Sequence, residues 1–187
     1  MANPVFLLSG WSTSGKDTVG QILQSKFGFQ RFAFADILKE LLATEFYFPV
    51  DWAHSESGKL KIPNSSNGKT VRQLLIQRGQ EIRSEKGDPG FFARFVASKI
   101  KMSKKPIVIT DWRLNIELET LRSEIQNPIF TVRIHRTGLL QSPIQNSFTE
   151  TELDTFNFDI YVENSGTSPE ELYEEIIKKL SPWLHFN

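Results

Sequence analysis

The 187-residue chain has no cysteine, which excludes disulfide bonds and thiolate zinc sites. Its histidines, His54, His135 and His185, are scattered and lack the spacing of metal ligands. Neither sign of charge is in excess, because 22 Lys and Arg residues balance 22 Asp and Glu residues. A chain without a positive field has little attraction for a nucleic-acid backbone, so we expect no nucleic-acid polymer as a partner.

Long apolar runs are also missing. The run Val5-Phe6-Leu7-Leu8 near the N-terminus is shorter than a membrane span or a signal-peptide core requires, and no basic region precedes it. We therefore expect a cytoplasmic protein that does not bind membranes. The length suits one compact domain covering residues 1–187.

A strand, a glycine-bounded loop and a helix follow one another at the N-terminus. The apolar run at residues 5–8 predicts a strand buried on both faces of a parallel sheet. The loop Gly10 to Gly15 comes next, and Lys16 opens a helix that ends before Gly28. The apolar residues of this helix recur at helical spacing: Val19, Ile22, Leu23 and Phe27.

The rest of the chain alternates in the same way. Further strands are predicted at residues 31–34, 106–110, 129–134 and 159–162, and an exposed excursion is predicted at about residues 48–68. The helix caps that we predict between these segments are Asp36, Asp88 followed by Pro89, Asn115 and Ser168, and a further helix is predicted to open at Thr70. This alternation predicts an α/β fold, a parallel five-stranded sheet with helices on both faces and ligands at the carboxyl ends of the strands.

The loop after the first strand has the spacing of a P-loop. Backbone N–H groups freed by the glycines, the helix N-terminus and the lysine together bind phosphate oxygens. The predicted nucleotide-binding residues are Gly10, Ser12, Thr13, Ser14, Gly15, Lys16, Asp17 and Thr18. A tight strand-to-helix turn with a solvated Lys16 is the alternative.

The position after the lysine departs from the motif. Asp17 stands where a P-loop has the Ser or Thr that binds magnesium, and Thr18 comes one residue later. Asp17 either holds magnesium through water or offsets the dipole of the helix. Asp17 and Thr18 are the candidate metal ligands.

An enzyme that moves a phosphoryl group between two phosphorylated molecules brings several negative charges together. Such an enzyme needs cations beyond the P-loop lysine. Arg113 and Asp111 follow the third predicted strand, where ligands of such sheets collect. The other candidate cations are Arg72, Arg78, Arg83 and Arg136. For these four, a solvated surface arginine is the alternative.

Over nearly its whole length, the chain resembles the deoxynucleoside monophosphate kinases of phages and large DNA viruses. The segments that carry the resemblance, in order, are Ser14-Gly15-Lys16-Asp17-Thr18, Phe34-Ala35-Asp36-Ile37-Leu38-Lys39, Arg72-Gln73-Leu74-Leu75, Gly79-Gln80-Glu81 with Arg83, Asp111-Trp112-Arg113 with Glu117, Thr149-Glu150-Thr151-Glu152-Leu153-Asp154 and Asn164-Ser165-Gly166-Thr167. Phosphomevalonate kinases of the animal type share part of this pattern and are the nearest alternative.

The resemblance implies a P-loop kinase domain that uses ATP and Mg²⁺ to phosphorylate a deoxynucleoside 5'-monophosphate. It places an acceptor-binding region at about residues 36–101 and a lid at about residues 136–148. The implied catalytic residues are Lys16, Arg136, Arg113 and Asp111, and the implied acceptor-binding residues are Asp36, Lys39, Arg72, Arg83 and Arg113. If the source is a virus, the location is the cytoplasm of the host cell.

Three questions stay open from the sequence. A P-loop switch or hydrolase without a second substrate is the alternative from a different class. The aromatic residues Trp52 and Phe46-Tyr47-Phe48 form either hydrophobic core or a pocket for an acceptor base. A homodimer is compatible with the sequence, which does not determine the oligomeric state.

Overall fold

The computed structural model describes residues 2–85, 87–138 and 152–184. The chain divides into two compact units, which are described separately. The first unit is formed by Met1–Ala33 together with Val96–Asn187, and the second by Phe34–Phe95. The acceptor-binding region predicted at residues 36–101 overlaps most of the second unit.

In the described residues, the first unit contains one five-stranded sheet in the order β2-β3-β1-β4-β5. Its strands are β1 (Val5–Ser9), β2 (Gln30–Phe32), β3 (Ile107–Ile109), β4 (Ile129–Arg136) and β5 (Ile160–Asn164). Every pair of neighbours is parallel. The prediction of an α/β fold with a parallel five-stranded sheet is therefore confirmed, with strand ends shifted by one or two residues.

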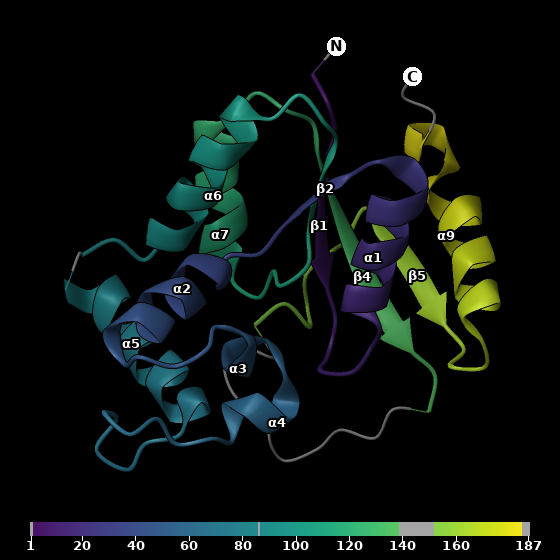
Figure 1. Cartoon of the computed structure of the whole chain (residues 1–187). Helices are drawn as coiled ribbons and strands as arrows, with labels where there is room; N and C mark the ends of the chain where they lie inside the picture. Colours follow the sequence, from purple (N-terminus) through teal and green to yellow (C-terminus); the bar gives the residue numbers. More distant parts are fainter. Residues whose placement is uncertain (1, 86, 139–151, 185–187) are drawn as a thin grey trace. The chain divides into compact units, whose positions relative to one another are not determined.

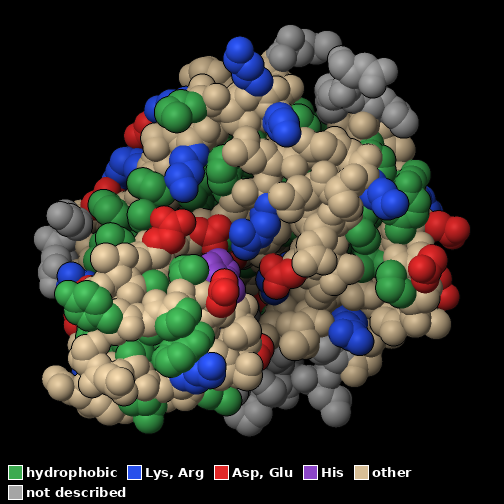
Figure 2. Space-filling model, viewed as in Figure 1, with side chains coloured by type: hydrophobic (Ala, Val, Ile, Leu, Met, Phe, Trp, Pro, Cys, Tyr) green, Lys and Arg blue, Asp and Glu red, His purple; other side chains and the backbone are tan. Residues whose placement is uncertain are grey.

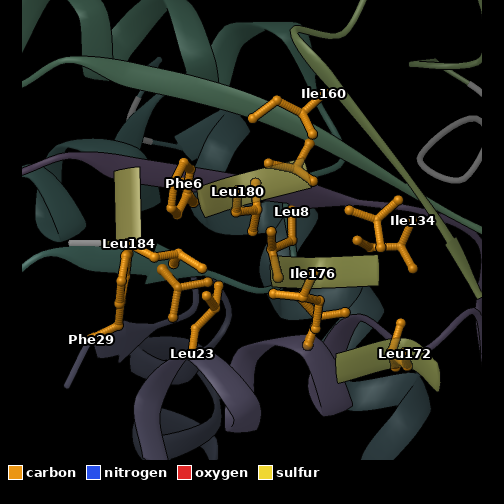
Figure 3. Packing of buried hydrophobic residues seen from close by; sticks show 14 residues of the cluster. Phe6, Leu8, Leu23, Phe29, Ile134, Ile160, Leu172, Ile176, Leu180 and Leu184 are labelled. Atoms are coloured by element: carbon orange, nitrogen blue, oxygen red, sulfur yellow. The ribbon is translucent and has the colours of Figure 1, made fainter. Parts of the chain in front are cut away.

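Helices cover both faces of this sheet. The helices α1 (Lys16–Phe27) and α9 (Pro169–Leu184) lie together on one side, and α7 (Asn115–Glu124) lies on the other (Figure 1). Phe6 and Leu8 of β1 point toward α1 and α9 and pack against Leu23 and Ile176 (Figure 3). Because β1 is buried on both faces, its carboxyl end and the loop that follows are held by the core.

The second unit is helical. It contains α2 (Asp36–Glu45), α3 (Asp51–His54), α4 (Glu56–Lys59) and α5 (Val71–Glu85), and α6 (Phe91–Met102) begins in it and continues into the first unit. The predicted excursion at residues 48–68 therefore includes two short helices. Phe48 is buried and stacks on Trp52, with ring centroids 6.1 Å apart, whereas Tyr47 is 90% exposed.

The cap predicted at Ser168 and the helix predicted to open at Thr70 are confirmed. The Thr70 hydroxyl accepts a hydrogen bond from the Gln73 amide, and the Gln73 side chain accepts one from the Thr70 amide. The Ser168 hydroxyl accepts a hydrogen bond from the Glu171 amide at the start of α9. Both residues satisfy amide groups that the first helical turn leaves without partners.

The predictions for Asp36, Asn115 and Pro89 are wrong by one or two residues. Asp36 and Asn115 are the first residues of their helices, and the caps are Ala35 and Leu114. The Asp36 carboxylate pairs with Lys39 instead of capping. Asp88 accepts a hydrogen bond from the Gly90 amide, so that α6 begins only at Phe91.

Charged residues of both signs are interspersed on the face seen in Figure 2, in keeping with the balanced composition. Within the ranges that the structure describes, none of the helices is both long enough and apolar enough to cross a membrane. Hydrophobic side chains are exposed mainly in the second unit, where they include Tyr47, Leu60, Ile62 and Ile76.

Candidate functional site

The loop between β1 and α1 has the geometry of an anion-binding turn. It follows the carboxyl end of β1 and leads directly into the N-terminus of α1. Thr13 and Gly15 both have positive φ values, 63° and 104°, and the Ser14 amide donates to the Trp11 carbonyl at 3.1 Å. Such alternation of backbone conformations turns successive N–H groups toward one point, and the dipole of α1 adds partial positive charge there.

Gly10 and Gly15 are needed at this turn because the surrounding atoms leave no room for a side chain. A Cβ on Gly10 would lie 2.5 Å from the Ile134 carbonyl oxygen, and one on Gly15 would lie 2.6 Å from Nδ2 of Asn164. Both distances are shorter than real Cβ contacts. The two glycines of the motif therefore let the loop approach β4 and β5 closely.

Lys16 is folded back over the loop. Its ammonium group donates to the Gly10 carbonyl at 2.5 Å and to the Trp11 carbonyl at 2.7 Å. The ammonium group therefore lies against the start of the loop, at Gly10 and Trp11. A phosphate that entered the loop would meet this charge without a large movement of the side chain.

Asn164, at the end of β5, binds the loop through its side chain. Its Nδ2 donates to the Ser14 carbonyl at 2.9 Å, and its Oδ1 accepts from the Gly166 amide at 3.0 Å. Asn164 was not among the predicted site residues. Its only signal in the sequence is a polar residue at the end of the last strand, in a segment that carries the family resemblance.

Ser14 has a buried hydroxyl group without a hydrogen-bond partner among the described residues. The residue is only 1% exposed. A buried polar atom of this kind is costly unless a partner is supplied. The described residues therefore leave the hydrogen-bonding capacity of the Ser14 hydroxyl unused.

Arg136 lies against the same loop. Its Nη1 donates to the Thr13 carbonyl at 3.2 Å, and a Cβ on Gly166 would lie 3.1 Å from its Nε. One small hollow is lined by Trp11, Ser14, Arg133, Ile134, His135 and Arg136. The structure therefore brings Arg136 together with the predicted P-loop residues.

The remaining P-loop residues face solvent. Ser12, Thr13, Asp17 and Thr18 are all exposed, and Asp17 and Thr18 lie in the first turn of α1. Over the described ranges, no group of three or more His, Cys, Asp or Glu residues is arranged as a metal site. The carboxylate and the hydroxyl in this turn are nevertheless oxygen ligands of the type that Mg²⁺ prefers.

Asp111 and Arg113 lie in the turn between β3 and α7, beside the carboxyl end of β3. The buried Trp112 anchors the turn, since its indole donates to the Leu114 carbonyl at 2.8 Å. The Glu117 carboxylate accepts from the amides of Arg113 and Leu114, both at 3.1 Å. This turn is therefore fixed in the same unit as the phosphate loop.

Thr110 closes β3 and has the second buried hydroxyl without a partner among the described residues. A Cβ on Gly20 would lie 2.5 Å from the Thr110 methyl group, so α1 runs close against the end of β3. Two unsatisfied hydroxyls, those of Ser14 and Thr110, thus lie on segments that flank α1.

In the second unit, two of the predicted acceptor-binding cations are paired with carboxylates. Lys39 bonds to Asp36 at 3.2 Å, and Arg72 bonds to Glu56 at 2.5 Å. Hydrogen bonds from Lys59 and from Arg72 outweigh the effect of burial and hold the pKa of Glu56 below its usual range. Glu56 therefore stays charged beside Arg72 at neutral pH.

Arg83 is held differently. Its guanidinium lies over the Phe92 ring, 4.9 Å from the centroid, and Nη1 donates to the Gly79 carbonyl at 3.3 Å. Its Nε is buried and has no hydrogen-bond partner among the described residues. Arg83 is thus a fixed cation with a donor left unsatisfied.

Arg78 takes part in a separate network on α5. It pairs with Glu45 at 3.6 Å and with Glu81 at 3.2 Å. Hydrogen bonds from Gln77 and then from Arg78 keep the pKa of Glu81 below its usual range. These residues line a hollow within the second unit.

The predicted lid lies largely outside the described residues, because only residues 136–138 of its range of 136–148 are described. The same holds for Thr149, Glu150 and Thr151 of the segment that resembles the end of the family lid. Glu152 and Asp154 of that segment are described.

No protein-family model matches the sequence. Solved structures are similar over nearly the whole chain. A dephospho-CoA kinase from Campylobacter jejuni is 14% identical, with a TM-score of 0.53 and coverage of 93% of this chain and 94% of that one. A putative kinase from Chloroflexus aurantiacus is 11% identical, with a TM-score of 0.51 and coverage of 95% of both chains.

A gluconokinase from Sinorhizobium meliloti is 13% identical, with a TM-score of 0.50 and coverage of 97% of this chain and 93% of that one. Identities this low show the fold alone. The chain therefore has the α/β fold of these kinases, with the loop Gly10 to Gly15 between its first strand and first helix.

Proposed function

We propose that this protein is a kinase that transfers the γ-phosphate of ATP to a small phosphorylated acceptor, a deoxynucleoside 5'-monophosphate. The observation that carries the proposal is the phosphate loop, in which Lys16 lies across the Gly10 and Trp11 carbonyls at the N-terminus of α1. The fold shared with solved kinases supports the same activity class.

The loop residues fit a polyphosphate. Oxygens bound at this turn would accept from the backbone amides and from the buried Ser14 hydroxyl, which has no partner among the described residues. Lys16 would exchange its bonds to two neutral carbonyls for stronger charge-assisted bonds to the β- and γ-phosphates. Arg136, which lies beside Thr13, would place its positive charge next to the bound phosphates.

Asp17 and Thr18 are the residues that would hold magnesium, directly or through water. When bound, the ion neutralises charge that develops on the phosphate oxygens. Asp111, in the turn after β3, is the second candidate carboxylate, and Arg113 two residues later would neutralise the transferring group.

The acceptor needs no strong general base, since an oxygen of a monophosphate is already a nucleophile near neutral pH. Positioning and charge neutralisation therefore account for most of the catalysis. In the second unit, Arg83 would bind the acceptor phosphate, because it is already oriented by Gly79 and Phe92 and keeps an unsatisfied donor. Arg72 would also bind the acceptor phosphate, in exchange for its bond to Glu56. The Asp36–Lys39 pair lies on the neighbouring helix α2.

Arg83→Ala is expected to lower kcat/KM for the acceptor by about 10- to 100-fold and to leave the KM for ATP unchanged, because a charged hydrogen bond to phosphate is worth about 1.5–3 kcal/mol. Phe92→Leu is expected to give a smaller loss in the same direction, since it removes the ring that orients the guanidinium. Steady-state kinetics with each substrate varied in turn measures both. A rise in the KM for ATP alone would contradict the assignment to the acceptor.

The proposal is tested by measuring ADP formation from ATP and Mg²⁺ with one acceptor at a time: dGMP, dTMP, dCMP, AMP or mevalonate 5-phosphate. We expect ADP to form rapidly only with one or more deoxynucleotides. A strong preference for mevalonate 5-phosphate would indicate a phosphomevalonate kinase instead. ADP formation at the same rate with every acceptor, and without any, would indicate a hydrolase or switch.

A further inference from the structure

Residues 152–158, called the brace below, contact three parts of the first unit. They reach the phosphate loop, strand β4 and the turn that carries Arg113. The loop and the turn follow the carboxyl ends of β1 and β3, and Arg133 of the neighbouring strand β4 pairs in register with Ser9, the last residue of β1. The brace is therefore in a position to fix their relative places.

Asp154 makes the contacts to the loop and to β4. Its Oδ1 accepts from Nε1 of Trp11 at 3.2 Å and from Nη2 of Arg133 at 2.6 Å. Arg133 also donates to the Ser9 hydroxyl at 3.2 Å and lies over the Phe158 ring. The side chains of Arg133 and Asp154 are only 14% and 31% exposed, so their attraction is less screened than that of a surface pair.

Glu152 and the aromatic residues of the brace make the contacts to the Arg113 turn. Glu152 Oε1 accepts from the Asn115 amide at 2.7 Å, which is one of the unpaired N–H groups at the start of α7. Phe156 packs edge-on against Trp112, with centroids 5.0 Å apart, and Leu153 is 2% exposed. The brace is thus anchored on the Arg113 side independently of Asp154.

Trp11 links the brace to the centre of the loop. Its carbonyl accepts from Lys16 Nζ at 2.7 Å and from the Ser14 amide at 3.1 Å. The residue whose side chain is held by the brace is thus the residue whose carbonyl accepts two bonds within the loop. Its indole N–H is the group through which a side chain of the brace reaches residues 10–13 in the described structure.

We propose that Asp154 is a positioning residue for the phosphate loop, which it holds by the Trp11 indole in the conformation that binds nucleotide. The carboxylate itself touches no phosphate. Through the brace, the loop is also kept in register with the Arg113 turn. This inference rests on the nucleotide-binding role of the loop in the proposed function, but it requires no particular acceptor.

Isothermal titration with ATP and Mg²⁺, without acceptor, measures the effect on binding. Asp154→Ala is expected to weaken ATP binding about ten-fold, the low end for loss of charged hydrogen bonds. Asp154→Asn keeps an acceptor oxygen for the indole and is expected to restore part of this loss. The double variant with Trp11→Phe and Asp154→Ala is expected to lose no more ATP affinity than Asp154→Ala alone, because the two substitutions remove the same hydrogen bond.

Glu174→Ala is the matched control, since Glu174 is an exposed carboxylate on α9, and it is expected to leave binding unchanged. The thermal midpoint of each variant is measured in parallel. If Asp154→Ala lowers the midpoint but binds ATP within two-fold of the parent protein, the residue is merely structural and the proposal is overturned. If the losses of ATP affinity from the two single substitutions add up in the double variant, Asp154 does not act through Trp11.

A second measurement does not depend on nucleotide. The chain has 4 tryptophans, and Trp11→Phe identifies the indole N–H signal of Trp11 in an NMR spectrum. Asp154→Ala is expected to shift that signal and the amide signals of residues 10–13, and an unchanged indole signal would overturn the proposal. If the parent protein binds no ATP, the proposed function fails, and the NMR result still decides whether Asp154 positions the loop.

Discussion

Replacing Lys16 with alanine is expected to lower turnover by about 100-fold or more. Loss of one preorganised charge contact at a transition state typically costs a factor of 100 to 1,000, or about 3 kcal/mol or more. The Lys16 ammonium lies 2.5 Å from the Gly10 carbonyl and 2.7 Å from the Trp11 carbonyl, over the turn proposed to bind the phosphates.

The same substitution is expected to leave the fold intact, because Gly10 and Trp11 are only partly buried and water can replace the ammonium. Lys26→Ala is the matched control, since Lys26 lies exposed in the last turn of the same helix. ADP formation with the preferred acceptor and the thermal midpoint are measured for both variants. Full turnover by Lys16→Ala, or an equal loss in Lys26→Ala, would contradict the role given to Lys16.

Gly15→Ala is expected to weaken ATP binding by about 10- to 100-fold and to lower stability. Gly15 has a φ of 104°, which costs other residues about 1–3 kcal/mol. An added Cβ would also lie 2.6 Å from Asn164 Nδ2 and would displace the side chain that bonds to the Ser14 carbonyl. The loop amides would then no longer converge.

Gly28→Ala separates backbone strain from the clash at the site. Gly28 also has a positive φ, 70°, at the other end of α1, but a Cβ there would meet nothing within 4 Å. We expect it to lower stability by about 1 kcal/mol and to leave ATP binding unchanged. Titration with ATP and thermal unfolding of the two variants make the comparison. Equal affinities in both variants would show that the fit of Gly15 against Asn164 does not matter for binding.

The parts of the fold that the sequence predicts are those set by local pattern. The continuous apolar run of β1, the helical spacing from Lys16 to Phe27 and the polar residues at Thr70 and Ser168 each constrain their own neighbourhood. The predictions were wrong where a distant or neighbouring charge competed for the cap. Asp36 pairs with Lys39, and Glu117 supplies the carboxylate at the start of α7.

For the candidate site, the phosphate loop is local and was predicted as a unit, because its glycines, lysine and helix are consecutive. The partners of the loop are not local. Asn164 and Asp154 are separated from it by more than a hundred residues, and no spacing rule connects them to Ser14 and Trp11. Phe92, which orients Arg83, is likewise supplied by a different helix.

The sequence by itself determined the alternation of strands and helices, the phosphate loop between the first two of them, and a second set of cations. These features depend on short-range periodicity and on the conformations that glycine alone adopts readily. Only the tertiary structure decided the strand order, the side chains that hold the loop, and which arginines are paired with carboxylates. The reason is that packing and hydrogen bonding between segments distant in sequence select one partner among many of the same type.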